Sequence, residues 1–190
     1  MAEPTARRTE THQRILDAAG RLFRRSGIDG VGVDAVMKEA GLTHGGFYAH
    51  FASKDALVAE VVRALLEKSA GNWNEISRTH PPGAALERIV LSYLDPDKVA
   101  SGLGCSLTSL GPDVARRAAS RSAIGAALGG MVEALTRVMP GRRRDRALAS
   151  LSTLVGAVVL ARLADDPGLA QDILDAAAAS ILPDRVSAPG

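Results

Sequence analysis

The apolar positions of this chain recur at the three- and four-residue spacing of helices along most of its length. The first such stripe predicts a helix that ends at Gly27, after the cations Arg24 and Arg25. Its inward face consists of Ile15, Leu16, Ala19, Leu22 and Phe23. We find no run in which apolar and polar residues alternate, as they would in a half-buried strand. The pattern therefore predicts an all-α protein.

Further helices are expected towards the C-terminus. Ser53 caps a long helix that fades near Trp73 to Ser77, and a break follows at 80–83. The next helix ends at Asp95-Pro96, before an irregular stretch over 95–111. A further helix runs from Pro112 to about Val138, and the final two helices cover 142–164 and 169–181.

Two short predicted helices joined by a glycine follow the first helix. An apolar-periodic segment from Val33 to Ala40 runs into Gly41, and Thr43 can cap a second short helix. Such a pair forms a helix-turn-helix, whose second helix can enter the major groove of DNA. That helix carries Gly45 and Gly46 in its first turn, where each costs about 1 kcal/mol relative to alanine. We therefore expect its backbone to lie close to a phosphate or a groove wall.

Residues Thr43 to Leu57 carry the pattern Thr-x-x-Gly-Phe-Tyr-x-His-Phe-x-Ser-Lys-Asp-x-Leu. This pattern resembles the TetR/AcrR family of bacterial transcription regulators. The resemblance implies an N-terminal three-helix helix-turn-helix domain with an N-terminal arm over residues 1–54, a larger helical effector-binding and dimerisation domain over 55–183, and a tail over 184–190. One departure is that Gly32 stands where the family usually has a Thr or Ser cap, so the cap is weaker here.

The expected DNA contacts combine helix faces with this resemblance. Phe47 and Phe51 lie four residues apart on one face and are expected to pack in the core. The resemblance places Tyr48 and His50, on the other side of the helix, and Lys54 on phosphates. The expected DNA-binding residues are Thr43, His44, Gly45, Gly46, Tyr48, His50 and Lys54.

Within this set the roles differ. Base reading is expected at His44, Gly45 and Gly46, where His44 offers the only long donor. Thr43 is either a cap alone or a cap that also binds a phosphate. Arg7 and Arg8 are expected to form a mobile arm, with a groove contact as the alternative.

Composition changes this picture little. A chain of 190 residues with 46% hydrophobic content is large enough for one or two small domains with a buried core. The formal net charge is only +2, and residues 1–60 hold eight Lys or Arg against eight Asp or Glu. Any DNA affinity must therefore come from where the charges lie and not from bulk basicity.

Several classes of function are not expected. The sequence lacks a CxxC pair, an HExxH motif, a Walker-type loop and a Gly-x-Ser-x-Gly elbow, so we expect no enzyme, metal site or cofactor. The polar start and the single cysteine are typical of a cytoplasmic protein. The apolar stretch over 147–160 is shorter than the roughly 20 residues of a membrane span, so a buried helix is expected, with no membrane partner.

The C-terminal domain is expected to bind a small-molecule effector. Trp73 and Tyr93 are the only aromatic residues outside the DNA-binding segment, and they either line a largely aliphatic cavity for an apolar effector or belong to the core. Cys105 is either a small buried hydrophobe or, because Gly-Cys-x-Leu resembles electrophile-sensing members of the family, a reactive thiol. The expected function is a repressor that an effector releases from a palindromic operator, and electrophile or redox sensing through Cys105 is the alternative. A helical binding module without DNA binding also remains open.

The last two helices are expected to form a homodimer. Their broad apolar faces can pack inside one subunit or against a second copy, and the resemblance implies a four-helix interface about a two-fold axis. A palindromic DNA site requires two copies of the motif, and hence a dimer. The expected interface residues are Leu148, Leu151, Val155, Val159, Ile173 and Leu174.

Overall fold

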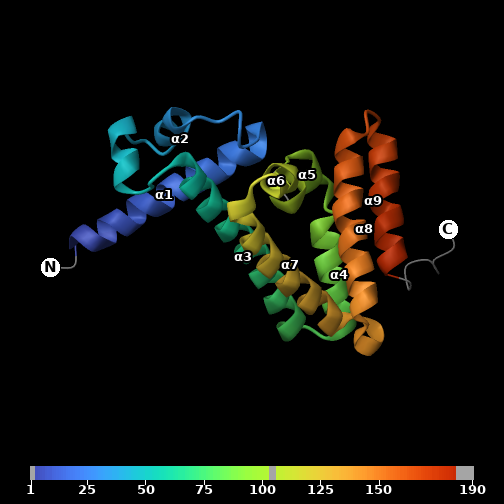
Figure 1. The fold of residues 1–190 in the computed structure, drawn as a ribbon. Coiled ribbons are helices and arrows are strands. Elements are labelled where there is room, and N and C mark those ends of the chain that lie inside the picture. Colours follow the sequence, from blue (N-terminus) through green and yellow to red (C-terminus); the bar gives the residue numbers. More distant parts are fainter. Residues whose placement is uncertain (1–2, 103–105, 183–190) are drawn as a thin grey trace.

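The computed structural model describes residues 3–102 and 106–182. The regular structure in these ranges is helical, without a strand, as predicted (Figure 1). The elements are α1 Glu3–Ser26, α2 Val33–Glu39, the 3-10 helix η1 His44–Ala49, α3 Lys54–Thr79, α4 Pro82–Tyr93, α5 Pro96–Ala100, α6 Ser106–Ala115, α7 Ala118–Val138, the 3-10 turn η2 Pro140–Arg142, α8 Arg144–Leu163 and α9 Pro167–Ile181.

The first three helices and the first turn of α3 form a unit that we call the head. Ile15 and Phe23 of α1, Phe47 of η1 and Leu57 of α3 are fully buried, so one small core joins these elements. Gly27 ends α1 with a φ of 71°, a conformation that glycine adopts without a steric penalty. Phe47 therefore lies in the core, as its helical spacing predicts.

The remaining helices form the body. Helix α3 leaves the head and runs beside α7, while α8 and α9 pack together at the edge farthest from α2 (Figure 1). Ser53 caps α3, since its hydroxyl accepts a hydrogen bond from the Ala56 N–H at 3.1 Å. The α3–α7 contact is close at Gly130, where an added Cβ would lie 3.4 Å from the Cβ of Ala70.

The sequence prediction was wrong between residues 95 and 117. The described residues of this stretch are largely helical: α5 begins at Pro96, and the Asp95 carboxylate caps it by accepting the Asp97 and Lys98 N–H groups at 3.0 and 3.3 Å. Pro112 lies inside α6 and does not open a helix. Helix α6 survives this proline because Leu110 and Val114, four residues apart, are buried.

Two further expectations also need correction. Helix α3 does not fade near Trp73 but continues to Thr79, because Trp73 and Ile76 are buried. Helix α8 is long and apolar enough to cross a membrane by length and composition alone. Core helices of soluble proteins can have the same length and composition. It was expected to be buried, but only 39% of its apolar window is buried in the protomer. One face of α8 is therefore open.

Candidate DNA interface and effector cavity

The turn between α2 and η1 is held by bonds within the chain. Gly41 has a φ of 67°, and its N–H donates to the Lys38 carbonyl at 3.0 Å. From α1, the Arg14 guanidinium donates to the Ala40 carbonyl at 2.7 Å. An added Cβ on Gly41 would lie 3.3 Å from that guanidinium, so both the backbone conformation and the space favour glycine here. Arg14 was not predicted as part of the motif.

The second helix of the motif is a 3-10 helix and not an α-helix. Thr43 occupies its N-cap position, but its side chain makes no capping hydrogen bond, contrary to the expected capping role. The Gly46 N–H instead donates to the Thr43 carbonyl at 3.1 Å, which is the short-range bond of a 3-10 helix. The exposed Thr43 hydroxyl remains available to a partner outside the chain.

The two glycines of η1 are not required by the fold. An added Cβ on Gly45 would meet nothing within 4 Å, and one on Gly46 would meet only the Met37 side chain, at an ordinary 3.6 Å. Neither glycine has a positive φ. The described residues therefore give no internal reason for glycine at these positions.

His44 and Tyr48 form the outer surface of η1. The Tyr48 side chain is exposed, and its ring lies edge-on to the His44 ring with 6.2 Å between centroids. His44 is also hydrogen-bonded through Nδ1 to the Asp34 carboxylate of α2. This bond orients the ring and becomes an ion pair when His44 is protonated. Sequence reasoning missed Asp34, because nothing in a pattern links it to a residue ten positions away.

His50 lies on a different side, among residues of α1. Its ring centroid is 5.9 Å from that of His12, which stacks on Phe51. Burial lowers the pKa of His50, and the nearby His12 and Arg8 lower it further. His50 Nδ1 is buried and has no hydrogen-bond partner in the described part of the chain. The neutral ring is therefore favoured at this position.

The basic residues of the head are also placed by the structure. Arg8 belongs to α1 and donates to the Ala49 carbonyl at 2.9 Å, and Arg7 lies in the same helix, so these two residues do not form a separate mobile arm. Lys54 is the first residue of α3 and is partly exposed. A cation at a helix N-terminus is disfavoured by the helix dipole, which an anionic partner would offset.

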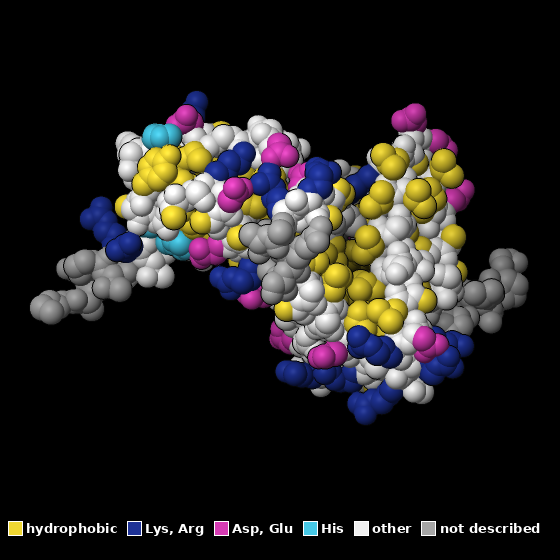
Figure 2. All heavy atoms as spheres, in the orientation of Figure 1, with side chains coloured by type: hydrophobic (Ala, Val, Ile, Leu, Met, Phe, Trp, Pro, Cys, Tyr) yellow, Lys and Arg dark blue, Asp and Glu magenta, His cyan; other side chains and the backbone are white. Residues whose placement is uncertain are grey.

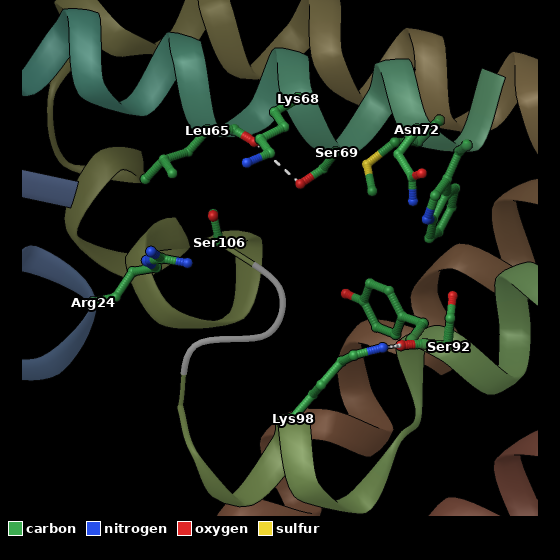
Figure 3. Close-up of a pocket in the computed structure, with 11 residues that line it drawn as sticks. Arg24, Leu65, Lys68, Ser69, Asn72, Ser92, Lys98 and Ser106 are labelled. Carbon is green, nitrogen blue, oxygen red and sulfur yellow. Dashed lines mark hydrogen bonds between the residues drawn. The ribbon is translucent and has the colours of Figure 1, made fainter. Parts of the chain in front are cut away.

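The body contains a cavity of about 500 Å³ beside α3 (Figure 3). Trp73 and Tyr93 both line it, and their rings meet edge to face with centroids 5.6 Å apart. The sequence suggested a largely aliphatic cavity, and this prediction was wrong, because many of the lining residues are polar or charged. Its other lining residues are Arg24, Leu65, Lys68, Ser69, Asn72, Ser92, Lys98, Ser106 and Met131. Cys105 lies outside the described residues.

Helix α6 and the residues after it connect this cavity to the head. Ser106, its first residue, lines the cavity, and Asp113 accepts the Ile28 N–H of the head at 3.1 Å. Arg117 then pairs with Asp55 at 2.8 Å and also with Asp29. These partners lie 62 or more positions apart, so no local pattern could have predicted them.

The expected interface residues divide into two groups. Leu148 and Val159 are exposed, and Val155 and Ile173 are partly exposed. Leu151 and Leu174 are buried within the protomer and therefore belong to its core, contrary to the expected interface role. Leu160, Leu163 and Leu169 extend the exposed apolar surface, and Figure 2 shows hydrophobic side chains gathered over α8 and α9.

A three-helix head with a helix-turn-helix, joined by a long helix to a helical body with a cavity, defines the class of helix-turn-helix transcription regulators. Residues 15–61 match the model of the bacterial regulatory proteins of the tetR family. The chain is 35% identical over 100 residues to the uncharacterized HTH-type transcriptional regulator TtgW of Pseudomonas putida, and the match covers 50% of this chain and 69% of TtgW. The chain belongs to the TetR family.

Other relatives agree with this assignment. AcrR of Shigella flexneri is 40% identical over 89 residues, which are 45% of this chain and 41% of AcrR. A TetR-family regulator from Agrobacterium tumefaciens has the same fold over 92% of this chain and 98% of its own, with a TM-score of 0.77 at 19% identity. The chain spans less than half the length of AcrR and of several other curated relatives. These relatives are named as transcriptional regulators, a class that is generally not enzymatic.

Proposed function

We propose that this protein is a DNA-binding repressor that leaves a palindromic operator when a small-molecule effector enters the cavity at Trp73 and Tyr93. The observation that carries this proposal is the position of the cavity. It is lined by Arg24 of the head and by Ser106 of α6, while α6 and Arg117 contact the head directly. A ligand in the cavity therefore touches the elements that set the orientation of the head.

The proposed DNA surface consists of η1 and the start of α3. Thr43, Tyr48 and Lys54 bind phosphates, because their polar groups are exposed or partly exposed at the ends of these elements. His50 is assigned to a phosphate on the family pattern alone. His44, Gly45 and Gly46 approach the bases, since the fold itself does not require either glycine. We propose residues 1–54 as the DNA-binding domain and 55–183 as the effector-binding and dimerisation domain, with a tail over 184–190.

The proposed dimer forms through the open faces of α8 and α9. Leu148, Val155, Val159 and Leu163 recur along α8 at the spacing of one helix face, and all are exposed or partly exposed. Leu169 and Ile173 provide the matching positions on α9. A two-fold arrangement covers this apolar face with an identical one and presents two heads to a palindromic site.

Effector binding is proposed to act by a shift of population. The effector binds more tightly to a dimer whose two heads no longer match the spacing of the operator, and this differential affinity drives release. Arg117, paired with Asp29 and Asp55, transmits the change because it ties the end of α6 to two points of the head. The protein acts in the cytoplasm, without a membrane partner.

Sensing of electrophiles through Cys105 is the alternative mechanism. It stays a prediction from the sequence, since Cys105 lies outside the described residues. An alkylating agent that releases the wild-type protein from DNA, but not a Cys105→Ser variant, would support it. Labelling of the thiol only at the rate of unfolding would exclude it.

The proposed function is tested by a gel-shift titration with DNA from upstream of the chain's own gene. A repressor of this class binds that DNA more tightly than a scrambled duplex of the same length. Equal affinity for the two duplexes would leave the chain as a helical binding module that has lost DNA recognition.

A further inference from the structure

We propose that the ligand of the cavity is a small amphipathic organic anion, whose charged group lies among Arg24, Lys68 and Lys98 and whose apolar body packs on Trp73 and Tyr93. This inference rests on the proposed effector role of the cavity and deepens it by naming the chemical class of the ligand. A carboxylate or sulfonate attached to a ring or a short chain has this chemistry.

The charged side chains around the cavity are all positive among the described residues that line it. Arg24 reaches it from α1, Lys68 from α3 and Lys98 from α5, so cations enter from three sides (Figure 3). None of the described side chains that line the cavity is acidic. Charges of one sign around a partly enclosed space create a potential that attracts the opposite sign.

Lys98 and Lys68 differ in how their charges are compensated within the protein. The Lys98 ammonium lies 3.3 Å from the Asp95 carboxylate and donates to the Ser92 carbonyl at 3.2 Å, so one of the three charges is offset. The Lys68 ammonium forms no hydrogen bond or ion pair within the described part of the chain. The cavity therefore keeps an excess of positive charge.

Arg24 is partly buried at the cavity, and its Nε donates to the Gly20 carbonyl at 3.0 Å. Burial lowers the pKa of its guanidinium, and the nearby Arg21 adds to that shift. The charged form of Arg24 is thus less stable here than in water. Arg21 repels it, whereas a carboxylate would attract it. An anion in the cavity would relieve both effects.

Part of the cavity lining is apolar. Trp73 and Met131 are buried, and the Trp73 and Tyr93 rings form a continuous edge-to-face surface. A purely inorganic anion would leave this surface uncovered. The volume of about 500 Å³ accommodates a small molecule, not a macromolecular segment. The ligand therefore needs both an anionic group and an apolar body.

The test compares two fluorescent probes of nearly the same shape. They are 8-anilinonaphthalene-1-sulfonate, an anion, and N-phenyl-1-naphthylamine, which lacks the sulfonate and is neutral. Trp73 is the only tryptophan of the chain, so energy transfer from it reports probe binding near the cavity without any DNA. The proposal predicts that the sulfonate probe binds more tightly, that added salt weakens only the sulfonate probe, and that inorganic phosphate alone does not displace it.

Variants locate the binding. Lys68→Gln is expected to weaken the sulfonate probe by about three-fold to ten-fold and to leave the neutral probe unchanged. Arg78→Gln is the matched control, because Arg78 is an exposed cation at the far end of the same helix and does not line the cavity. Circular dichroism confirms that each variant is folded.

Three results would overturn the proposal: equal affinity for both probes, equal effects of the two variants, or no energy transfer from Trp73 to the sulfonate probe. These results are distinct from a failure of the proposed function. If the sulfonate probe binds but upstream DNA is not bound or released, the ligand class stands and the repressor proposal fails. If a neutral ligand releases the DNA while the sulfonate probe does not bind, the repressor proposal stands and the ligand class is wrong.

Discussion

Arg117 Nη1 lies 2.8 Å from Oδ1 of Asp55, so the residue between α6 and α7 is paired with the first turn of α3. The same guanidinium pairs with Asp29 in the segment between α1 and α2. Because α6 also begins at the cavity, this pair joins the cavity to the helix that carries Lys54. The link is electrostatic and partly exposed, so it can break without unfolding either unit.

Arg117→Gln is expected to weaken the coupling between ligand and DNA. The ratio of DNA affinities without and with a cavity ligand should move towards one, by about two-fold to thirty-fold. DNA titrations by fluorescence anisotropy measure this ratio. Arg63→Gln is the control, because among the described residues Arg63 pairs within α3 alone, with Glu67 at 3.1 Å. An unchanged ratio in Arg117→Gln would show that this contact carries no coupling.

Val159→Glu is expected to break the dimer while the protomer stays folded. Val159 is exposed in the protomer, so the charge costs little there, but it would be buried without a partner in the proposed interface. Light scattering should show half the mass of the wild type, with the helix content unchanged. Tyr48→Glu places the same charge on an exposed residue of the head and should remain dimeric. A dimeric Val159→Glu protein would place the interface elsewhere.

Gly45→Ala is expected to change the stability of the fold and the affinity for DNA in opposite directions. An added Cβ meets nothing within 4 Å, so alanine should stabilise the fold by about 0.5–1 kcal/mol in urea unfolding. DNA binding should nevertheless weaken, because the methyl group occupies the surface that approaches the bases. Gly41→Ala is the contrasting variant and should destabilise the fold, since its φ is 67°. Wild-type DNA affinity in Gly45→Ala would contradict the proposed close approach.

Lys54→Ala should weaken binding to every DNA sequence by a similar factor and reduce the salt slope of the affinity by about one unit. His44→Ala should instead relax the preference at one or two base positions. Titrations at several salt concentrations with specific and scrambled DNA measure both effects. An unchanged salt slope in Lys54→Ala would refute the phosphate contact.

The lowered pKa of His50 predicts a dependence of stability on pH. Its ordinary pKa is 6.5, and burial, His12 and Arg8 lower it in the folded state. The unfolded chain therefore binds the proton more readily, so stability is lost as the pH falls below 6.5. His50→Gln should reduce this loss in urea unfolding measured between neutral and mildly acidic pH. An identical pH dependence in the variant would show that His50 does not contribute.

The head could be predicted from the sequence because its signals are local. A glycine that ends a helix, a serine cap and apolar residues four positions apart each act within one or two turns. The pattern could not show that η1 is a 3-10 helix or that His44 pairs with Asp34, since both depend on how neighbouring elements pack. The same limit explains the error at Pro112, whose helix is held by tertiary burial.

The positive charge of the cavity lining could not be predicted from the sequence, because it also depends on how distant elements pack. Trp73 and Tyr93 could be singled out as the aromatic residues left over from the head. The local sequence does not distinguish the three cations of the cavity, Arg24, Lys68 and Lys98, from ordinary exposed cations on helices. Only the packing of α1, α3 and α5 brings these three charges to one cavity.

Binding in the cavity is proposed to control binding to DNA. The most direct measurement is fluorescence anisotropy of labelled DNA from upstream of the gene, titrated with the protein and then with the sulfonate probe. We expect the protein to bind this DNA more tightly than a scrambled duplex and to release it when the probe is added. The probe should release less DNA from the Lys68→Gln variant than from the Arg78→Gln variant. Equal binding to both duplexes, or release that is the same in the two variants, would contradict this proposal.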